Sequence, residues 1–247
     1  MRSRLDVEMT RRGLAESREI AQRLIMAGRV RVNSRPAAKP DLKVDPATEI
    51  AVVPSGSEFA SRGAHKLIAA LDHFRVNVEG RHALDVGAST GGFTDVLLRR
   101  GAAHVIALDV GYGQLAERLR RDPRVTVIDR TNIRHVKGEI LPFRPDLVVV
   151  DTSFISLRLV LPAVVALVAR PAEIIALVKP QFEVGKGKVG RGGIVRDEVL
   201  RAQVLAEVLG FAAAIGLEVV GSIESPITGA SGNREYLAMF RCPEMDG

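Results

Sequence analysis

The chain has 247 residues, of which 47% are hydrophobic and 26% are charged, and its formal net charge is +6. This composition supports a packed core and argues against a disordered chain. The single cysteine, Cys242, excludes a disulfide within the chain. We therefore expect a cytoplasmic protein, with neither a signal peptide nor an apolar run long enough to span a membrane.

The first 53 residues predict a compact domain with two short helices followed by two strands. Leu5 and Met9 lie one helical turn apart, and Gly13 ends the first helix. Ser17 is a suitable N-cap for a second helix, and Gly28 is a suitable C-terminal stop. Short strands are expected over 30–33 and 49–53, with a turn at 33–34.

This amino-terminal segment is also the most basic part of the chain. Residues 1–50 carry 11 Lys and Arg against 7 Asp and Glu, which favours a polyanionic partner. The segment resembles the S4 RNA-binding domain in Arg11-Arg-Gly-Leu and in Leu24-Ile-Met-Ala-Gly-Arg-Val-Arg-Val-Asn. No aromatic residue precedes Phe59, so contacts to the RNA backbone are favoured over base stacking. The candidate RNA-binding residues are Arg4, Arg11, Arg12, Arg18, Arg31, Lys39 and Lys43.

Residues 54–63 are interpreted as a linker, and residues 64–247 as a second domain in which strands and helices alternate. Its short apolar runs begin at His82, His104, Val125, Asp146 and Glu173, and most of them end at a charged residue. This pattern is typical of buried parallel strands with functional groups at their carboxyl ends. Intervening helices are expected over 92–100, 155–169 and 197–215, and an antiparallel strand pair over 217–224 and 234–241. We predict an α/β fold with one open, doubly wound sheet.

The first of these strands runs into the glycine-rich turn Asp85-Val-Gly-Ala-Ser-Thr-Gly-Gly-Phe. Asp85 would repel a phosphate but could hold an ammonium group, and the turn contains no Lys or Arg for a pyrophosphate. Asp109 ends the second strand, where a carboxylate can bind ribose hydroxyls. Together these features favour S-adenosylmethionine over NAD. The candidate cofactor-binding residues are Asp85, Gly87, Ser89, Gly91, Phe93, Asp109 and Asp129.

Four charged residues, Lys66, Asp151, Lys179 and Glu235, lie in or beside predicted strand ends. Their order resembles the catalytic tetrad of RNA ribose 2′-O-methyltransferases. The surrounding sequence is similar to the TlyA (hemolysin A) family of ribosomal RNA 2′-O-methyltransferases over nearly the whole chain. The resemblance implies a Rossmann-like, seven-stranded methyltransferase domain of FtsJ type behind the S4 domain. It also implies that Lys179 accepts a proton from, or orients, the ribose hydroxyl, that Asp151 positions Lys179, and that Lys66 and Glu235 hold the ribose.

The resemblance further implies a cytidine of ribosomal RNA within ribosomal subunits as the substrate. The short amino terminus favours the family members that act on the large subunit alone. One departure concerns the linker, where the family often carries a basic and aromatic tetrapeptide but this chain has Ser57-Glu-Phe-Ala.

Several alternatives stay open from the sequence. The hemolysin label suggests a membrane-lytic protein, but no spanning helix or long series of amphipathic strands is present. A non-catalytic RNA-binding protein is a second alternative, which the intact tetrad disfavours. The basic loop 185–193 could close over RNA or be an ordinary surface loop. The five histidines lack the spacing of metal ligands, so no metal is expected.

Overall fold

The computed structural model describes residues 2–26, 28–37, 39–52, 59–185, 189–190, 192–229 and 232–244. The chain divides into two compact units, Met1–Glu58 and Phe59–Gly247. Half of the expected linker, residues 54–58, lies outside the described residues, as do parts of the 185–193 loop and Ser57-Glu58 of the departing tetrapeptide.

The first unit contains both predicted helices. Its elements are β1 (Ser3–Arg4), α1 (Leu5–Arg11), α2 (Arg18–Met26), β2 (Val30–Val32), β3 (Arg35–Pro36), β4 (Lys43–Val44) and β5 (Ile50–Val52). The Ser17 hydroxyl accepts a hydrogen bond from the Ile20 amide at 3.2 Å, and Gly28 has a φ of 70°, as the predicted cap and stop require. The two-residue strands β1, β3 and β4 were not predicted, because two residues are too few to show the alternation of apolar and polar side chains that is typical of a strand.

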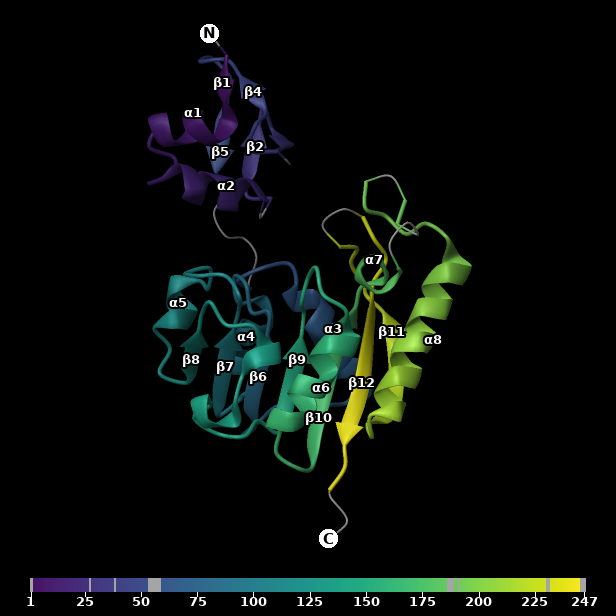
Figure 1. Ribbon diagram of the computed structural model, residues 1–247. Coiled ribbons are helices and arrows are strands. Elements are labelled where there is room, and N and C mark those ends of the chain that lie inside the picture. The colour runs from purple at the N-terminus through teal and green to yellow at the C-terminus, as the bar shows by residue number, and fades with distance from the viewer. Residues whose placement is uncertain are drawn as a thin grey trace. The chain divides into compact units, whose positions relative to one another are not determined.

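The second unit is built around a seven-stranded sheet (Figure 1). Its elements are α3 (Ala64–Phe74), β6 (His82–Val86), α4 (Gly92–Arg99), β7 (His104–Leu108), α5 (Glu117–Arg120), β8 (Val125–Ile128), β9 (Leu147–Val150), α6 (Leu157–Leu167), β10 (Ala172–Val178), α7 (Pro180–Glu183), α8 (Glu198–Ala214), β11 (Glu218–Glu224) and β12 (Tyr236–Cys242), with two short 3-10 helices, Ile133–His135 and Gly138–Ile140. The strand order is β11-β12-β10-β9-β6-β7-β8. β12 runs in the opposite direction to the other six strands, which are parallel to one another. The predicted α/β fold class is confirmed.

Helices cover both faces of this sheet, and each face has its own apolar core. α6 and α8 pack on one face, against strand residues such as Leu84, Ile106 and Val148. α3 and α4 pack on the other face, against the alternating residues Ala83 and Val105. Because successive side chains of a strand point to opposite faces, a sheet covered on both sides needs continuous apolar strands, which is the pattern the sequence displays.

The parallel strands all present their carboxyl ends at one edge of the sheet. Asp85, Asp109, Asp129, Asp151 and Lys179 lie in or directly after these ends. α3, which carries Lys66, was not predicted as a helix, because Gly63 at its N-cap offers no capping side chain and its first turn has no acidic residue. No helix among the described residues is long and apolar enough to cross a membrane.

Candidate active site

The glycine-rich turn lies between β6 and α4, against the end of β9. Gly87 has a φ of 87°, and a Cβ atom there would lie 2.6 Å from the Asp151 carbonyl oxygen. The Asp151 amide in turn donates to the Val86 carbonyl at 2.9 Å. Only glycine permits this conformation at such a close approach. The turn is therefore in direct contact with Asp151, the first residue after β9.

Asp85 is fully buried beneath this turn. Its Oδ2 accepts hydrogen bonds from the Thr94 amide at 2.9 Å and the Thr94 hydroxyl at 2.7 Å. Its Oδ1 is buried without a hydrogen-bond partner among the described residues. Burial raises the pKa of Asp85 to about 7, against the opposing effect of the Thr94 hydroxyl. A buried acceptor oxygen without a donor is costly, and a bound cationic group would compensate it.

Asp109 and Asp129 follow the ends of the next two strands. Asp109 accepts from the Ser89 amide at 2.8 Å and from the Gly111 amide at 2.6 Å, which fixes the carboxylate beside the glycine-rich turn. Asp129 accepts from the Gly113 amide and from Arg120, both at 3.0 Å. Burial alone would raise the pKa of Asp129, but these two contacts lower it on balance.

Phe93 is placed differently from the other candidate cofactor-binding residues. Its side chain is 4% exposed and belongs to the apolar core beneath α4. It therefore packs the helix against the sheet, and a direct role for the side chain in cofactor binding stays a prediction.

The four tetrad candidates form two short ion pairs. Lys66 Nζ lies 2.6 Å from Glu235 Oε2, and Lys179 Nζ lies 2.6 Å from Asp151 Oδ1. Lys66 and Lys179 are each 7% exposed and Glu235 is 3% exposed, so these charges are held away from bulk water. Lysine side chains are usually exposed and solvated, and the burial of two of them against carboxylates costs free energy. A purely structural role at the edge of a sheet does not require this cost.

The register of the sheet explains why residues far apart in the sequence meet here. β10 pairs with β12 so that Val178 faces Tyr236, which places Lys179 beside Glu235 at the next position. β9 lies on the other side of β10, with Val150 facing Ala176, and so brings Asp151 to the same edge. The tetrad and the cofactor turn therefore share one end of the sheet.

Two side chains in this cluster were missed from the sequence. The Ser153 hydroxyl accepts a hydrogen bond from Lys179 at 2.8 Å, and Gln181 donates to Glu235 Oε1 at 3.3 Å. Both lie within two residues of a tetrad member, and this proximity was the only available signal. Glu183, at the end of α7, caps α6 by accepting from the Ser156 hydroxyl at 2.6 Å and the Leu157 amide at 2.7 Å.

The candidate RNA-binding arginines of the first unit are not simple exposed charges. Arg4 and Arg18 both pair with Asp6, at 3.0 and 2.9 Å, and Arg11 and Arg12 both pair with Glu8, at 2.6 and 2.7 Å. The two carboxylates are almost fully buried. The hydrogen bond from Arg4 lowers the pKa of Asp6 well below its usual range, and Arg11 has the same effect on Glu8.

The paired arginines differ in how much of the side chain is exposed and could contact RNA. The side chains of Arg11 and Arg18 are 62% and 53% exposed, so part of each guanidinium faces solvent. Arg12 is 23% exposed and also donates to the carbonyls of Thr48 and Pro46, which makes it a structural residue. The three remaining candidates are exposed, with no ion pair to any described residue: Arg31, Lys39 and Lys43.

The comparisons with known proteins agree with this geometry. The family model for FtsJ-like methyltransferases matches residues 59–242, and the model for the S4 domain matches residues 3–50. The fold and site therefore define an FtsJ-like methyltransferase joined to an S4 domain. More narrowly, the chain belongs to the TlyA family.

Three relatives illustrate the family. The chain is 55% identical to the 16S/23S rRNA (cytidine-2′-O)-methyltransferase TlyA of Mycobacterium tuberculosis, over 97% of this chain and 90% of the relative. It is 40% identical to Hemolysin A of Brachyspira hyodysenteriae, over 96% and 99%. A solved structure from Streptococcus thermophilus, also named as a hemolysin, has a TM-score of 0.77 and 41% identity, and covers 98% of this chain and 89% of its own.

Proposed function

We propose that this protein transfers a methyl group to the ribose 2′-hydroxyl of a cytidine in ribosomal RNA, using S-adenosylmethionine. The observation that carries the proposal is the two ion pairs of buried lysines, Lys66–Glu235 and Lys179–Asp151, at the same sheet edge as the glycine-rich turn. The relative from M. tuberculosis, named for this reaction on both subunits, supports the substrate. A ribosomal substrate also agrees with the cytoplasmic location expected from the sequence.

The residues around the turn fit the proposed cofactor. Buried Asp85 Oδ1 has no donor among the described residues and suits an ammonium group, while Asp109 keeps unused lone pairs for ribose hydroxyls. Gly87, Ser89 and Gly91 line the turn, and Asp129 lies at the end of the next strand. S-adenosylmethionine, when bound, supplies an activated methyl group on a sulfonium centre.

The tetrad then supplies position and proton handling. Asp151 and Ser153 fix the side-chain nitrogen of Lys179, which can orient a ribose hydroxyl. Only as a neutral amine, after its own proton has left, could Lys179 also take up the proton of that hydroxyl. Glu235, held by Lys66 and Gln181, can accept a hydrogen bond from the ribose on the other side. Lys66, Lys179 and Glu235 are buried, whereas Asp151 and Ser153 reach solvent and leave the cluster open to a substrate on that side.

The test of the function is to map the methyl group. Purified protein, incubated with ribosomal subunits from cells that lack it and with labelled S-adenosylmethionine, is expected to label ribosomal RNA at one or a few cytidine 2′-oxygens. Separate incubation of small and large subunits identifies the substrate. Label on a base, or no label on either subunit, would contradict the proposal.

Cofactor affinity is expected to depend on pH through Asp85. The ionised form attracts an ammonium group and is lost as the pH falls below about 7, so affinity should fall by up to about 10-fold per pH unit below that value. Calorimetry with S-adenosylhomocysteine between about pH 5.5 and 7.5 measures this dependence of affinity on pH.

Two variants test whether Asp85 is the group responsible. In Asp85→Asn the affinity should be low and nearly independent of pH. In Asp109→Asn, the matched control, affinity should be lower but should still depend on pH, with the dependence displaced to lower pH because the Asp109 charge helps to raise the pKa of Asp85. An equal slope in Asp85→Asn and the unmodified protein would disprove the assignment.

A further inference from the structure

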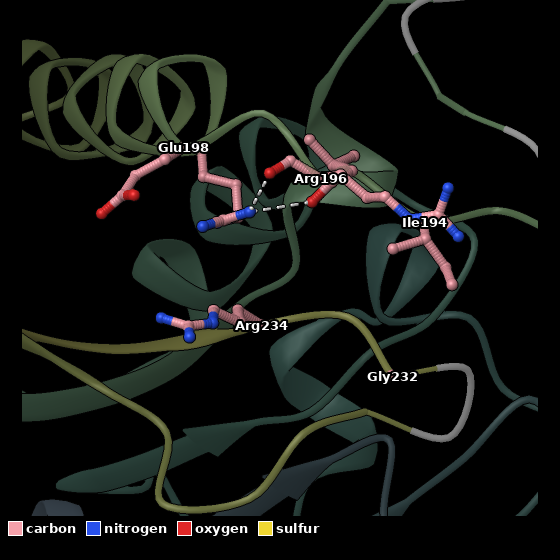
Figure 2. Close-up of a pocket in the computed structure, with 7 residues that line it drawn as sticks. Ile194, Arg196, Glu198, Gly232 and Arg234 are labelled. Carbon is pink, nitrogen blue, oxygen red and sulfur yellow. Dashed lines mark hydrogen bonds between the residues drawn. The ribbon is translucent and has the colours of Figure 1, made fainter.

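A basic pocket lies at the beginning of α8, and its lining includes the segment that precedes β12. It has a volume of about 370 Å³, and its lining includes Val195, Arg196, Glu198, Arg201 and Arg234 (Figure 2). Three arginines against one glutamate give this lining a positive charge. In Figure 2 the side chains of Arg196 and Glu198 extend in opposite directions, and neither has an ion-pair partner among the described residues.

Arg201 is the unusual member of this lining. Its side chain is 7% exposed, and one terminal nitrogen donates to the carbonyls of Val195 at 3.2 Å and Arg196 at 2.7 Å, shown as dashed lines in Figure 2. Its Nε is buried and has no hydrogen-bond partner among the described residues. A buried guanidinium retains its charge, so an unused N–H in a pocket is a donor for an acceptor that comes from outside the chain.

The walls of the pocket are held in place by hydrogen bonds. Asn233, which is 3% exposed, accepts from the Val195 amide at 3.0 Å and donates to the Gly193 carbonyl at 2.9 Å. Together with the two bonds from Arg201, these contacts tie the segment before α8 to the segment before β12. The Asp197 side chain already accepts from the first-turn amides of Val199 and Leu200, so binding rests on the arginines and not on the helix terminus.

The position of the pocket relative to the tetrad indicates its ligand. Arg234 lines the pocket, and the next residue, Glu235, is held by Lys66 in the tetrad. A ribose in an RNA chain is bonded to a phosphodiester on each side, so an anion site on the segment that carries Glu235 suits a flanking phosphate. Guanidinium groups bind phosphate oxygens through paired, charge-assisted hydrogen bonds.

We infer that this pocket binds a backbone phosphate of the substrate RNA next to the methylated nucleotide, through Arg201 and Arg234. The inference rests on the proposed function. It assigns to the methyltransferase unit a subsite that aligns the ribose, in addition to the affinity supplied by the first unit. Arg234 now pairs with Glu224 at 3.3 Å through one nitrogen, and the other donors of its half-exposed side chain remain for the phosphate.

The test is steady-state kinetics with ribosomal subunits as substrate. Arg234→Gln is expected to raise KM for RNA about 10-fold, with kcat changed by less than about twofold, because a charge-assisted contact made equally in the ground and transition states is lost. The slope of log(kcat/KM) against log salt should become shallower by about 0.7–0.9. Affinity for S-adenosylhomocysteine should not change. Arg201→Lys, which keeps the charge but loses the Nε–H, should also raise KM.

Arg241→Gln is the matched control. Arg241 lies near the carboxyl end of β12, whereas Arg234 lies two residues before that strand begins. Arg241 is 51% exposed against 55% for Arg234, and it likewise pairs with a glutamate of β11. Kinetics of Arg234→Gln equal to those of Arg241→Gln, in a wild-type enzyme that methylates RNA, would overturn the subsite. Absence of transfer by the wild type would instead overturn the proposed function. If Arg201→Lys lowers the melting temperature, the half-exposed Arg234 still decides the outcome.

Discussion

Lys179→Ala is expected to lower the rate of methyl transfer by about 10²-fold or more while leaving cofactor affinity intact. Lys179 Nζ is fixed by Asp151 and Ser153 and does not touch Asp85 or Asp109, so its loss removes proton handling but not the cofactor-binding groups. The measurements are single-turnover rates on ribosomal subunits and calorimetry with S-adenosylhomocysteine. Lys137→Ala, which removes an exposed lysine outside the tetrad, is the control and should keep the wild-type rate.

Lys179→Arg separates two roles for this residue. A guanidinium keeps its proton under all ordinary conditions, so an enzyme that needs a base at this position should be as slow as Lys179→Ala. Partial activity of Lys179→Arg would show that the side chain only orients the hydroxyl. A near wild-type rate for Lys179→Ala would mean that the Lys179–Asp151 pair merely stabilises the sheet edge.

Deletion of residues 1–58 is expected to abolish methylation of ribosomal subunits and to leave cofactor binding unchanged. Unit Phe59–Gly247 contains both apolar cores of the sheet, whereas the core of the first unit is a separate cluster that includes Leu5, Met9 and Ile25. The catalytic unit should therefore fold alone. Loss of the first unit removes the exposed parts of Arg11 and Arg18 together with Arg31, Lys39 and Lys43.

The reason for the lost activity can be measured in the full-length chain. Each phosphate contact removed by Arg→Gln at Arg18 or Arg31 should make the slope of log affinity against log salt shallower by about 0.7–0.9. Arg12→Gln should instead lower the melting temperature of the first unit, because the Arg12 nitrogens bind Glu8 and three carbonyls. A truncated protein that methylates subunits as fast as the full chain would show that the first unit has another function.

The sequence by itself determined the strands of the large sheet, the helices α4, α6 and α8 that lie between them, and the edge of the sheet that carries the site, but not α3. Short apolar runs that end in charge, such as those before Asp151 and Lys179, predict buried parallel strands, because both faces must be apolar and only the ends can be polar. The glycine turn was also evident from the sequence. The structure gives the reason for its glycine: a positive φ at Gly87 and the contact with the residue after β9 exclude other residues there.

Only the tertiary structure decided which charges meet. Lys66 and Glu235 are separated by 169 positions, and their pairing depends on α3 packing on one face and β12 inserting between β10 and β11. The same holds for Arg201, whose position on α8 looks like that of any surface arginine until the pocket is seen. Periodicity reports how a residue is exposed within its own element, whereas ion pairs and pockets depend on strand order and register, which arise from packing between distant segments.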